Sequence, residues 1–123
     1  MRYVMLIHEP REYIEARGNQ TLDPYIGAWR LYYKALVEAG VYLSGAPLKD
    51  STTATTVRLK NGRRHVQDGP FAEAKEQLGG FMILELPSLD AALEWAARCP
   101  AAAVGAVEVR PMHVEMHDTI VNP

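Results

Sequence analysis

Two short runs of the chain, residues 2–8 and 81–86, are apolar on both faces of an extended strand. Successive side chains of a strand point to opposite faces, so a strand with one solvent-exposed face alternates apolar and polar residues. These runs do not alternate in that way, because Val4 and Leu6 are as apolar as their neighbours. Each run is therefore expected to lie in the interior of a sheet that is covered on both faces.

The remaining segments predict an α+β fold. The sequence indicates helices over residues 23–39 and 89–98, short strands over 41–44 and 106–110, and a hairpin over 52–67 that turns at Asn61-Gly62. Asn-Gly between two β-rich runs is a strong hairpin signal. The order of the elements is that of the ferredoxin-like split βαβ fold, with the hairpin inserted before the strand at 81–86. We expect one domain over residues 1–123, in which 112–123 form a C-terminal extension or tail.

A count of sheet faces predicts a homodimer. Two helices cover only one face of a sheet of four or five strands, whereas Val4, Leu6, Phe81 and Ile83 place apolar side chains on the other face. An apolar face of that size is unusual on a soluble monomer, so we expect a two-fold copy of the chain to cover it. The two copies would then enclose a mostly apolar cavity with a few polar groups, which is typical of a small-molecule site. By alternation, the polar residues on this face are His8, Glu85, Arg58, Glu108 and Arg110.

The loop from Asp68 to Gly80 is dense in turn-forming and charged residues. In Asp68-Gly69-Pro70 the aspartate can accept hydrogen bonds from backbone amides ahead of it, and the proline presets a helical φ. We expect a brief helical segment over residues 71–77 that ends at Gly79-Gly80. Such a loop would hold four charged side chains in defined positions, namely Asp68, Glu73, Lys75 and Glu76.

Charge and cysteine content narrow the class of protein. A net charge of -2 disfavours direct binding to nucleic acid or to an anionic membrane surface. The single cysteine, Cys99, excludes an internal disulfide and is typical of a reducing compartment. The first apolar run is too short for a signal peptide or a membrane span. These features predict a cytoplasmic protein.

A family resemblance covers nearly the whole chain and is densest from about residue 39 to 111. It rests on five runs, residues 54–58, 68–81, 89–90, 94–96 and 107–111, of which the long central one begins with Asp68-Gly69-Pro70-Phe71. The chain resembles the YCII-related proteins of the DGPF type. The resemblance implies a ferredoxin-like dimeric α+β barrel and a small cytoplasmic bacterial protein. It also implies a gene often found beside, or fused to, that of an extracytoplasmic-function sigma factor.

The resemblance brings no established reaction with it. The better-studied YCII branch has a His-Asp pair with the histidine on the first helix, but residues 25–33 contain no histidine here. That pair cannot be transferred to this chain. Asp68 matches the aspartate of the DGPF motif itself, so only the residues of that motif carry over.

Asp68 and His8 are the candidate acid/base residues. Histidine has an ordinary pKa close to neutral, and His8 lies at a strand end beside the expected cavity; the alternative is a structural histidine. Asp68 is a general acid/base or a ligand anchor in one interpretation and only caps a turn in the other. The candidate substrate-binding residues, whose alternative is to form structural ion pairs, are Arg58, Glu73, Lys75 and Glu76.

Two other groups have weaker functional interpretations. Four aromatic residues of the two predicted helices can line a pocket, but aromatic residues at helical spacing are more often core. They are Trp29, Tyr32, Tyr33 and Trp95. His113, Glu115 and His117 resemble a metal cluster. On a strand the two histidines would be roughly 13 Å apart, and on a helix Glu115 would point away from them. We therefore expect no metal site and no bound cofactor.

Two functional hypotheses follow. In the first, a homodimer binds or transforms a small organic molecule by acid/base chemistry in a cavity around Asp68, His8 and Arg58. In the second, the chain is a non-catalytic partner of a sigma factor that acts through protein contacts and does not bind DNA. The residues do not establish whether the chain is an enzyme.

Overall fold

The computed structural model describes residues 1–18 and 23–122. From the N-terminus the elements are β1 (Arg2–Pro10), α1 (Arg11–Glu15), α2 (Asp23–Glu38), β2 (Tyr42–Pro47), the 3-10 turn η2 (Ser51–Thr53), β3 (Thr55–Lys60), β4 (Arg63–Asp68), β5 (Glu76–Glu85), α3 (Leu89–Arg98), α4 (Ala101–Val104), β6 (Ala106–Pro111) and α5 (Val114–Val121).

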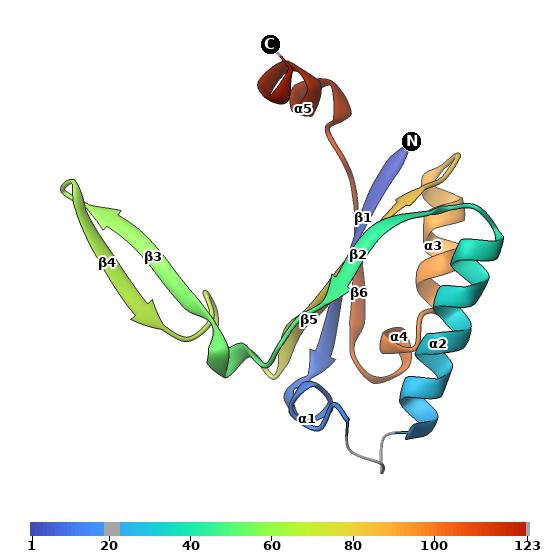
Figure 1. Ribbon diagram of the computed structural model, residues 1–123, viewed down its shortest axis with the longest axis horizontal. Helices are drawn as coiled ribbons and strands as arrows, with labels where there is room; N and C mark the ends of the chain where they lie inside the picture. Colours follow the sequence, from blue (N-terminus) through green and yellow to red (C-terminus); the bar gives the residue numbers. More distant parts are fainter. Residues whose placement is uncertain (19–22, 123) are drawn as a thin grey trace.

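The main sheet has the strand order β2-β5-β1-β6, and every neighbouring pair is antiparallel. When the hairpin strands β3 and β4 are left out, the four strands in chain order lie in the order 2-3-1-4 across the sheet. Two βαβ units produce this order when a strand of one unit lies between the two strands of the other. The expected α+β, ferredoxin-like arrangement is confirmed. Within it β1 is central and lies between β5 and β6 (Figure 1).

The core lies between this sheet and the helices α2 and α3, which pack on one of its faces (Figure 1). Alternation along β1 places Tyr3, Met5 and Ile7 in that core, all at most 3% exposed. Tyr32 of α2 donates a hydrogen bond to the carbonyl oxygen of Trp95 in α3 at 2.8 Å. This bond and the packing around it connect the two helices across the core.

The opposite face of the sheet has no covering from α2, α3 or α4 (Figure 1). The four apolar side chains expected on this face, Val4, Leu6, Phe81 and Ile83, are half-buried. Val4 of β1 pairs with Ile83 of β5, and Leu6 pairs with Phe81. We call these four residues the open face. Their apolar character without a helical layer agrees with the expectation that two helices cover one side only.

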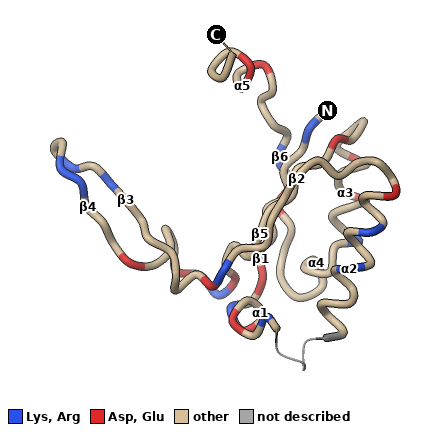
Figure 2. Tube along the Cα trace, viewed as in Figure 1, with Lys and Arg blue, Asp and Glu red and all other residues tan. Residues whose placement is uncertain are grey.

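Strands β3 and β4 form a separate two-stranded sheet that projects from the body as an arm (Figure 1). The arm turns at Asn61 and Gly62, whose φ values of 51° and 75° are those of a primed hairpin turn. Lys and Arg residues run along it (Figure 2), and its apolar residues Leu59 and Val66 are 73% and 53% exposed. The predicted hairpin is confirmed, and it has no core of its own.

The brief helix expected over residues 71–77 is wrong. Residues 69–75 are irregular, and β5 begins at Glu76, so Gly79 and Gly80 lie inside a strand. A Cβ on Gly80 would lie 2.9 Å from the carbonyl oxygen of Ala46, and one on Gly79 would overlap the carboxylate of Glu9. The two glycines therefore allow close approach of neighbouring groups within the sheet.

The C-terminal residues form the helix α5, which stands apart from the sheet (Figure 1). The imidazole Nδ1 of His113 accepts a hydrogen bond from the backbone amide of Met116 at 3.2 Å and so caps this helix. None of the helices in the described part of the chain is long and apolar enough to span a lipid bilayer.

Candidate functional site

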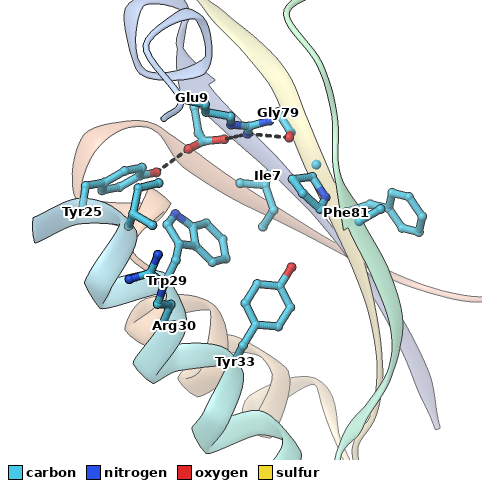
Figure 3. Close-up of a pocket in the computed structure, with 13 residues that line it drawn as sticks. Ile7, Glu9, Tyr25, Trp29, Arg30, Tyr33, Gly79 and Phe81 are labelled. Atoms are coloured by element: carbon cyan, nitrogen blue, oxygen red, sulfur yellow. Dashed lines mark hydrogen bonds and ion pairs between the residues drawn. The ribbon is translucent and has the colours of Figure 1, made fainter. Parts of the chain in front are cut away.

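A pocket of about 490 Å³ lies between α2 and the edge of the sheet formed by β5 and β2 (Figure 3). It is on the helix side of the sheet, because Ile7 of β1 and Trp29 and Tyr33 of α2 line it. Phe81 borders the pocket but turns its ring away, to the other side of the sheet (Figure 3). The site is therefore distinct from the open face.

One side of α2 supplies the aromatic wall of the pocket. Tyr25, Trp29 and Tyr33 follow one another at four-residue spacing, which places them in one row along a helix. The Tyr25 and Trp29 rings meet edge to face at 6.4 Å, and the Trp29 and Tyr33 rings are 5.7 Å apart. These contacts restrain the rings, so the wall is largely preformed.

Glu9 is the charged group at one end of the pocket. It lies near the end of β1 and is only 2% exposed. Its Oε1 accepts a hydrogen bond from Arg17 at 2.8 Å, and its Oε2 accepts one from the Tyr25 hydroxyl at 2.5 Å (Figure 3). A buried carboxylate is stable only when it is paired and hydrogen-bonded, and both conditions are met here.

Arg17 holds this end of the site together. Besides Glu9, its guanidinium donates to the carbonyl oxygens of Gly79, at 2.7 Å, and Leu48. These contacts join the segment after α1 to β5 and to the chain that follows β2. Gly79 allows the approach, because any side chain there would occupy the space of the Glu9 carboxylate.

The tyrosines of the pocket stay protonated at neutral pH. Burial, and then the hydrogen bond to Glu9, raise the pKa of Tyr25 above its ordinary value of 10.0. Burial also raises the pKa of Tyr33. Tyr25 is thus a hydrogen-bond donor to Glu9. The site combines one anchored carboxylate with neutral phenols in apolar surroundings, an arrangement that can hold and polarise a bound hydroxyl or amine.

His8 lies next to the open face, away from the pocket. Its Nε2 is 3.3 Å from Glu108 Oε1, and Glu108 Oε2 accepts a hydrogen bond from Arg110 at 2.6 Å. The hydrogen bonds from Arg110 and then His8 hold the pKa of Glu108 below its ordinary value. His8, Glu108 and Arg110 therefore form a hydrogen-bonded polar row across β1 and β6.

The other sequence-predicted residues lie on the arm and on the loop after it, and their side chains do not meet in one place. Asp68 is exposed at the end of β4, and Arg58 of β3 lies over the ring of Phe71, 5.1 Å from its centroid. Along the loop, Glu73 pairs with Arg11 at 3.8 Å, Lys75 is exposed, and Glu76 is half-buried. Within one chain, neither Asp68 nor Arg58 borders the pocket.

Sequence reasoning missed Glu9, Tyr25 and Arg30, which line the pocket. Glu9 stands just before Pro10, beyond the apolar run expected over residues 2–8, although the strand continues through it. Its place two residues after Ile7, on the buried side of the alternation, was an available signal. Of the four aromatic residues that could line a pocket, Trp29 and Tyr33 line this one, whereas Tyr32 lies in the core and Trp95 packs against it.

Fold and site together define a small α+β protein with a ligand-sized pocket between its first long helix and its sheet. The chain belongs to the YCII-related family, since the model of the YCII-related domain matches residues 1–115. The resemblance inferred from the sequence is confirmed.

Two known proteins illustrate the relationship. An uncharacterized protein of Rhizobium meliloti (strain 1021) is 35% identical over 114 residues, which is 91% of this chain and 92% of that protein. The structure of a 5-chloro-2-hydroxyhydroquinone dehydrochlorinase from Burkholderia phenoliruptrix AC1100, in complex with 2,5-dihydroxybenzoquinone, matches with a TM-score of 0.52. That match has 17% sequence identity and covers 91% of this chain and 93% of the dehydrochlorinase. At this identity the likeness concerns the fold.

Proposed function

We propose that this protein binds a small, mainly apolar organic molecule in the pocket between α2 and the sheet, and that Glu9 accepts a hydrogen bond or a proton from it. The observation that carries the proposal is a carboxylate, 2% exposed, at the end of an apolar cavity of about 490 Å³. A carboxylate oxygen can accept two hydrogen bonds. Oε1 and Oε2 accept from Arg17 and Tyr25, so each keeps an acceptor position for a ligand.

The size and make-up of the cavity support this proposal. Small-molecule sites are typically apolar cavities of about 300–1,000 Å³ with a few well-placed polar groups. The dehydrochlorinase of similar fold was solved with a single-ring compound bound, which is a molecule of the size that this cavity accommodates. Acid/base chemistry on such a compound is the reaction class that Glu9 and Tyr25 can perform.

A ligand screen with a blocked pocket tests the proposal. We expect at least one small ring compound to raise the melting temperature, since binding to the native state stabilises it by mass action. Ile26→Trp should fill the pocket and abolish the shift. The matched control is Leu31→Trp, on the same helix at a position that is 71% exposed, and it should keep the shift. Equal stabilisation of both variants would contradict the proposal.

The assembly we propose is a homodimer formed through the open face and the arm. An isolated two-stranded hairpin is marginally stable in water, and the apolar side of this arm has no partner in the described chain. A second copy can cover both surfaces at once. Light scattering should give the mass of two chains for the wild type and for Leu93→Lys, a control on α3, but of one chain for Ile83→Lys. A dimeric Ile83→Lys variant would refute this interface.

The site first inferred from the DGPF motif remains a separate prediction. In the dimer, Asp68, His8 and Arg58, with Glu73, Lys75 and Glu76, would line a chamber on the open face, where Asp68 and His8 would move protons. A ligand shift that is lost in Asp68→Asn but kept in Ile26→Trp would favour that chamber over the pocket. The sigma-factor hypothesis also remains a prediction, and co-purification of a sigma factor with the tagged protein would test it.

A further inference from the structure

The two arginines that line the pocket are in different situations. Arg17 is engaged by Glu9 and by two carbonyl groups. Arg30 is an exposed residue of α2, one turn after Ile26 in the same row of the helix. Among the side chains that the structure describes, which leave out residues 19–23 and 123, no carboxylate forms an ion pair with Arg30. Arg30 is therefore a cation at the rim of the pocket that is available to a ligand.

The interior of the pocket does not accept a charged group. Glu9 is already neutralised by Arg17, so a second cation beside it would lack a counter-charge. An anion placed there would be repelled by the Glu9 carboxylate in surroundings of low polarity. The remaining walls are apolar side chains and protonated phenols. A ligand can present only a neutral donor at the Glu9 end, and any negative charge it carries must lie at the rim.

The spacing along α2 sets the length of the ligand. Tyr25, which contacts Glu9, and Arg30 are five residues apart, which is about 7.5 Å along a helix axis at about 1.5 Å per residue. One six-membered ring with a substituent at each end spans that length. Trp29 lies between Tyr25 and Arg30 along the helix, and the Tyr33 ring lies next to it, with 5.7 Å between the two ring centroids. Both rings line the pocket and offer the aromatic contacts that such a ring prefers.

We propose that the pocket takes an aromatic carboxylate, with its carboxylate on Arg30 at the rim, its ring against Trp29 and Tyr33, and a hydroxyl at the far end that donates to Glu9. This inference rests on the proposed function, because it assumes that the pocket is the ligand site. It adds the chemical class of the ligand. It also assigns Arg30 as the residue that selects for negative charge.

Calorimetry with three probes tests the inference. The probes are 4-hydroxybenzoate, its neutral methyl ester, and benzoate, which lacks the hydroxyl. We expect 4-hydroxybenzoate to bind most tightly of the three. Arg30→Gln should weaken its binding about fivefold, the upper range for an ion pair at a solvent-exposed position, and leave the ester unchanged. Raised salt should weaken the acid and not the ester.

Lys34→Gln is the matched control. Lys34 is on the same helix, 71% exposed and paired with Glu38, and it does not line the pocket. Its replacement should change the affinity for none of the probes. If Lys34→Gln weakens the binding of 4-hydroxybenzoate as much as Arg30→Gln does, the effect comes from the total positive charge of α2, and the assigned role of Arg30 is refuted.

The outcomes separate this inference from the function on which it rests. If the ester and the acid bind equally, and Arg30→Gln changes neither, the carboxylate assignment is refuted while the pocket remains a ligand site. If benzoate binds as tightly as 4-hydroxybenzoate, the assigned contact of the hydroxyl with Glu9 is refuted. If none of the probes binds but other ring compounds shift the melting temperature, the ligand class is wrong. If no ring compound binds at all, the proposed function fails as well.

Discussion

Replacing Arg17 by methionine should destabilise the protein by about 3 kcal/mol. The change keeps an unbranched, flexible side chain but leaves the Glu9 carboxylate, which is 2% exposed, without its cation. Breaking a buried ion pair costs about 3–5 kcal/mol, and we take the lower end because the Arg17 side chain is 28% exposed. At about 4 °C per kcal/mol for a chain of this size, the melting temperature should fall by about 12 °C.

Urea unfolding at neutral pH measures this loss directly, with the m-value as a check that the unfolding transition is otherwise unchanged. A loss below about 1 kcal/mol would show that water reaches Glu9, since that is the range of solvent-exposed pairs. The double variant Arg17→Met with Glu9→Gln removes both charges. It should be less destabilised than the sum of the single variants by about 2 kcal/mol, because no uncompensated charge remains buried.

Gly79→Ala, in β5, should disturb the same Glu9–Arg17 ion pair. Its Cβ would overlap Glu9 Oε1 and lie 3.0 Å from an Arg17 nitrogen, so the pair must separate or the strand must shift. The loss of stability should be similar to that of Arg17→Met, measured in the same urea experiment. If the variant is as stable as the wild type, the Glu9 side chain can move aside without a loss in the free energy of unfolding, and the expected clash is refuted.

Three further predictions concern other parts of the molecule. Gly27→Ala in α2 should stabilise by about 0.5–1 kcal/mol and raise the urea midpoint, because the added Cβ meets nothing within 4 Å and the helix propensity improves; a lower midpoint would contradict this. Burial raises the pKa of the Cys99 thiol from 9.0 to about 11. The stability that this thiol contributes is therefore complete below pH 9.0 and is lost as the pH rises through 11. Iodoacetamide at pH 8 should label Cys99 in the unfolded chain and leave the native protein unlabelled. Arg110→Gln should move the pKa of Glu108 up toward its ordinary value of 4.5, as measured by NMR titration. In the wild type, the stability that this carboxylate contributes is present above pH 4.5 and is lost as the pH falls through the lowered pKa of the folded state. An unchanged pKa in the variant would argue against the hydrogen bond from Arg110.

Sequence reasoning succeeded where the signal lies within a few residues. The lack of alternation at Val4 and Leu6 correctly indicated a strand with two apolar faces, and Asn61-Gly62 indicated the hairpin turn. The same reasoning failed at Gly79-Gly80, where glycines were interpreted as the end of a helix. Their role depends on groups from β1, the segment after α1 and β2, which no local pattern reveals.

The chemistry of the pocket depends in the same way on residues that are distant in the sequence. Glu9, Arg17, Tyr25 and Gly79 meet at one point, although Gly79 is 62 residues from Arg17. Read singly, Glu9 is an acidic residue before a proline and Tyr25 belongs to an aromatic stripe. Their partners become evident only when α2 is placed against β1 and β5.

The order of strands and helices, the hairpin and the family follow from the sequence by itself, because side-chain alternation and turn chemistry act between near neighbours. Only the tertiary structure decided that a pocket lies on the helix side of the sheet, that a buried glutamate forms its end, and that an arginine stands at its rim. A cavity forms where the surfaces of distant elements fail to fill the space between them, and that property belongs to their packing.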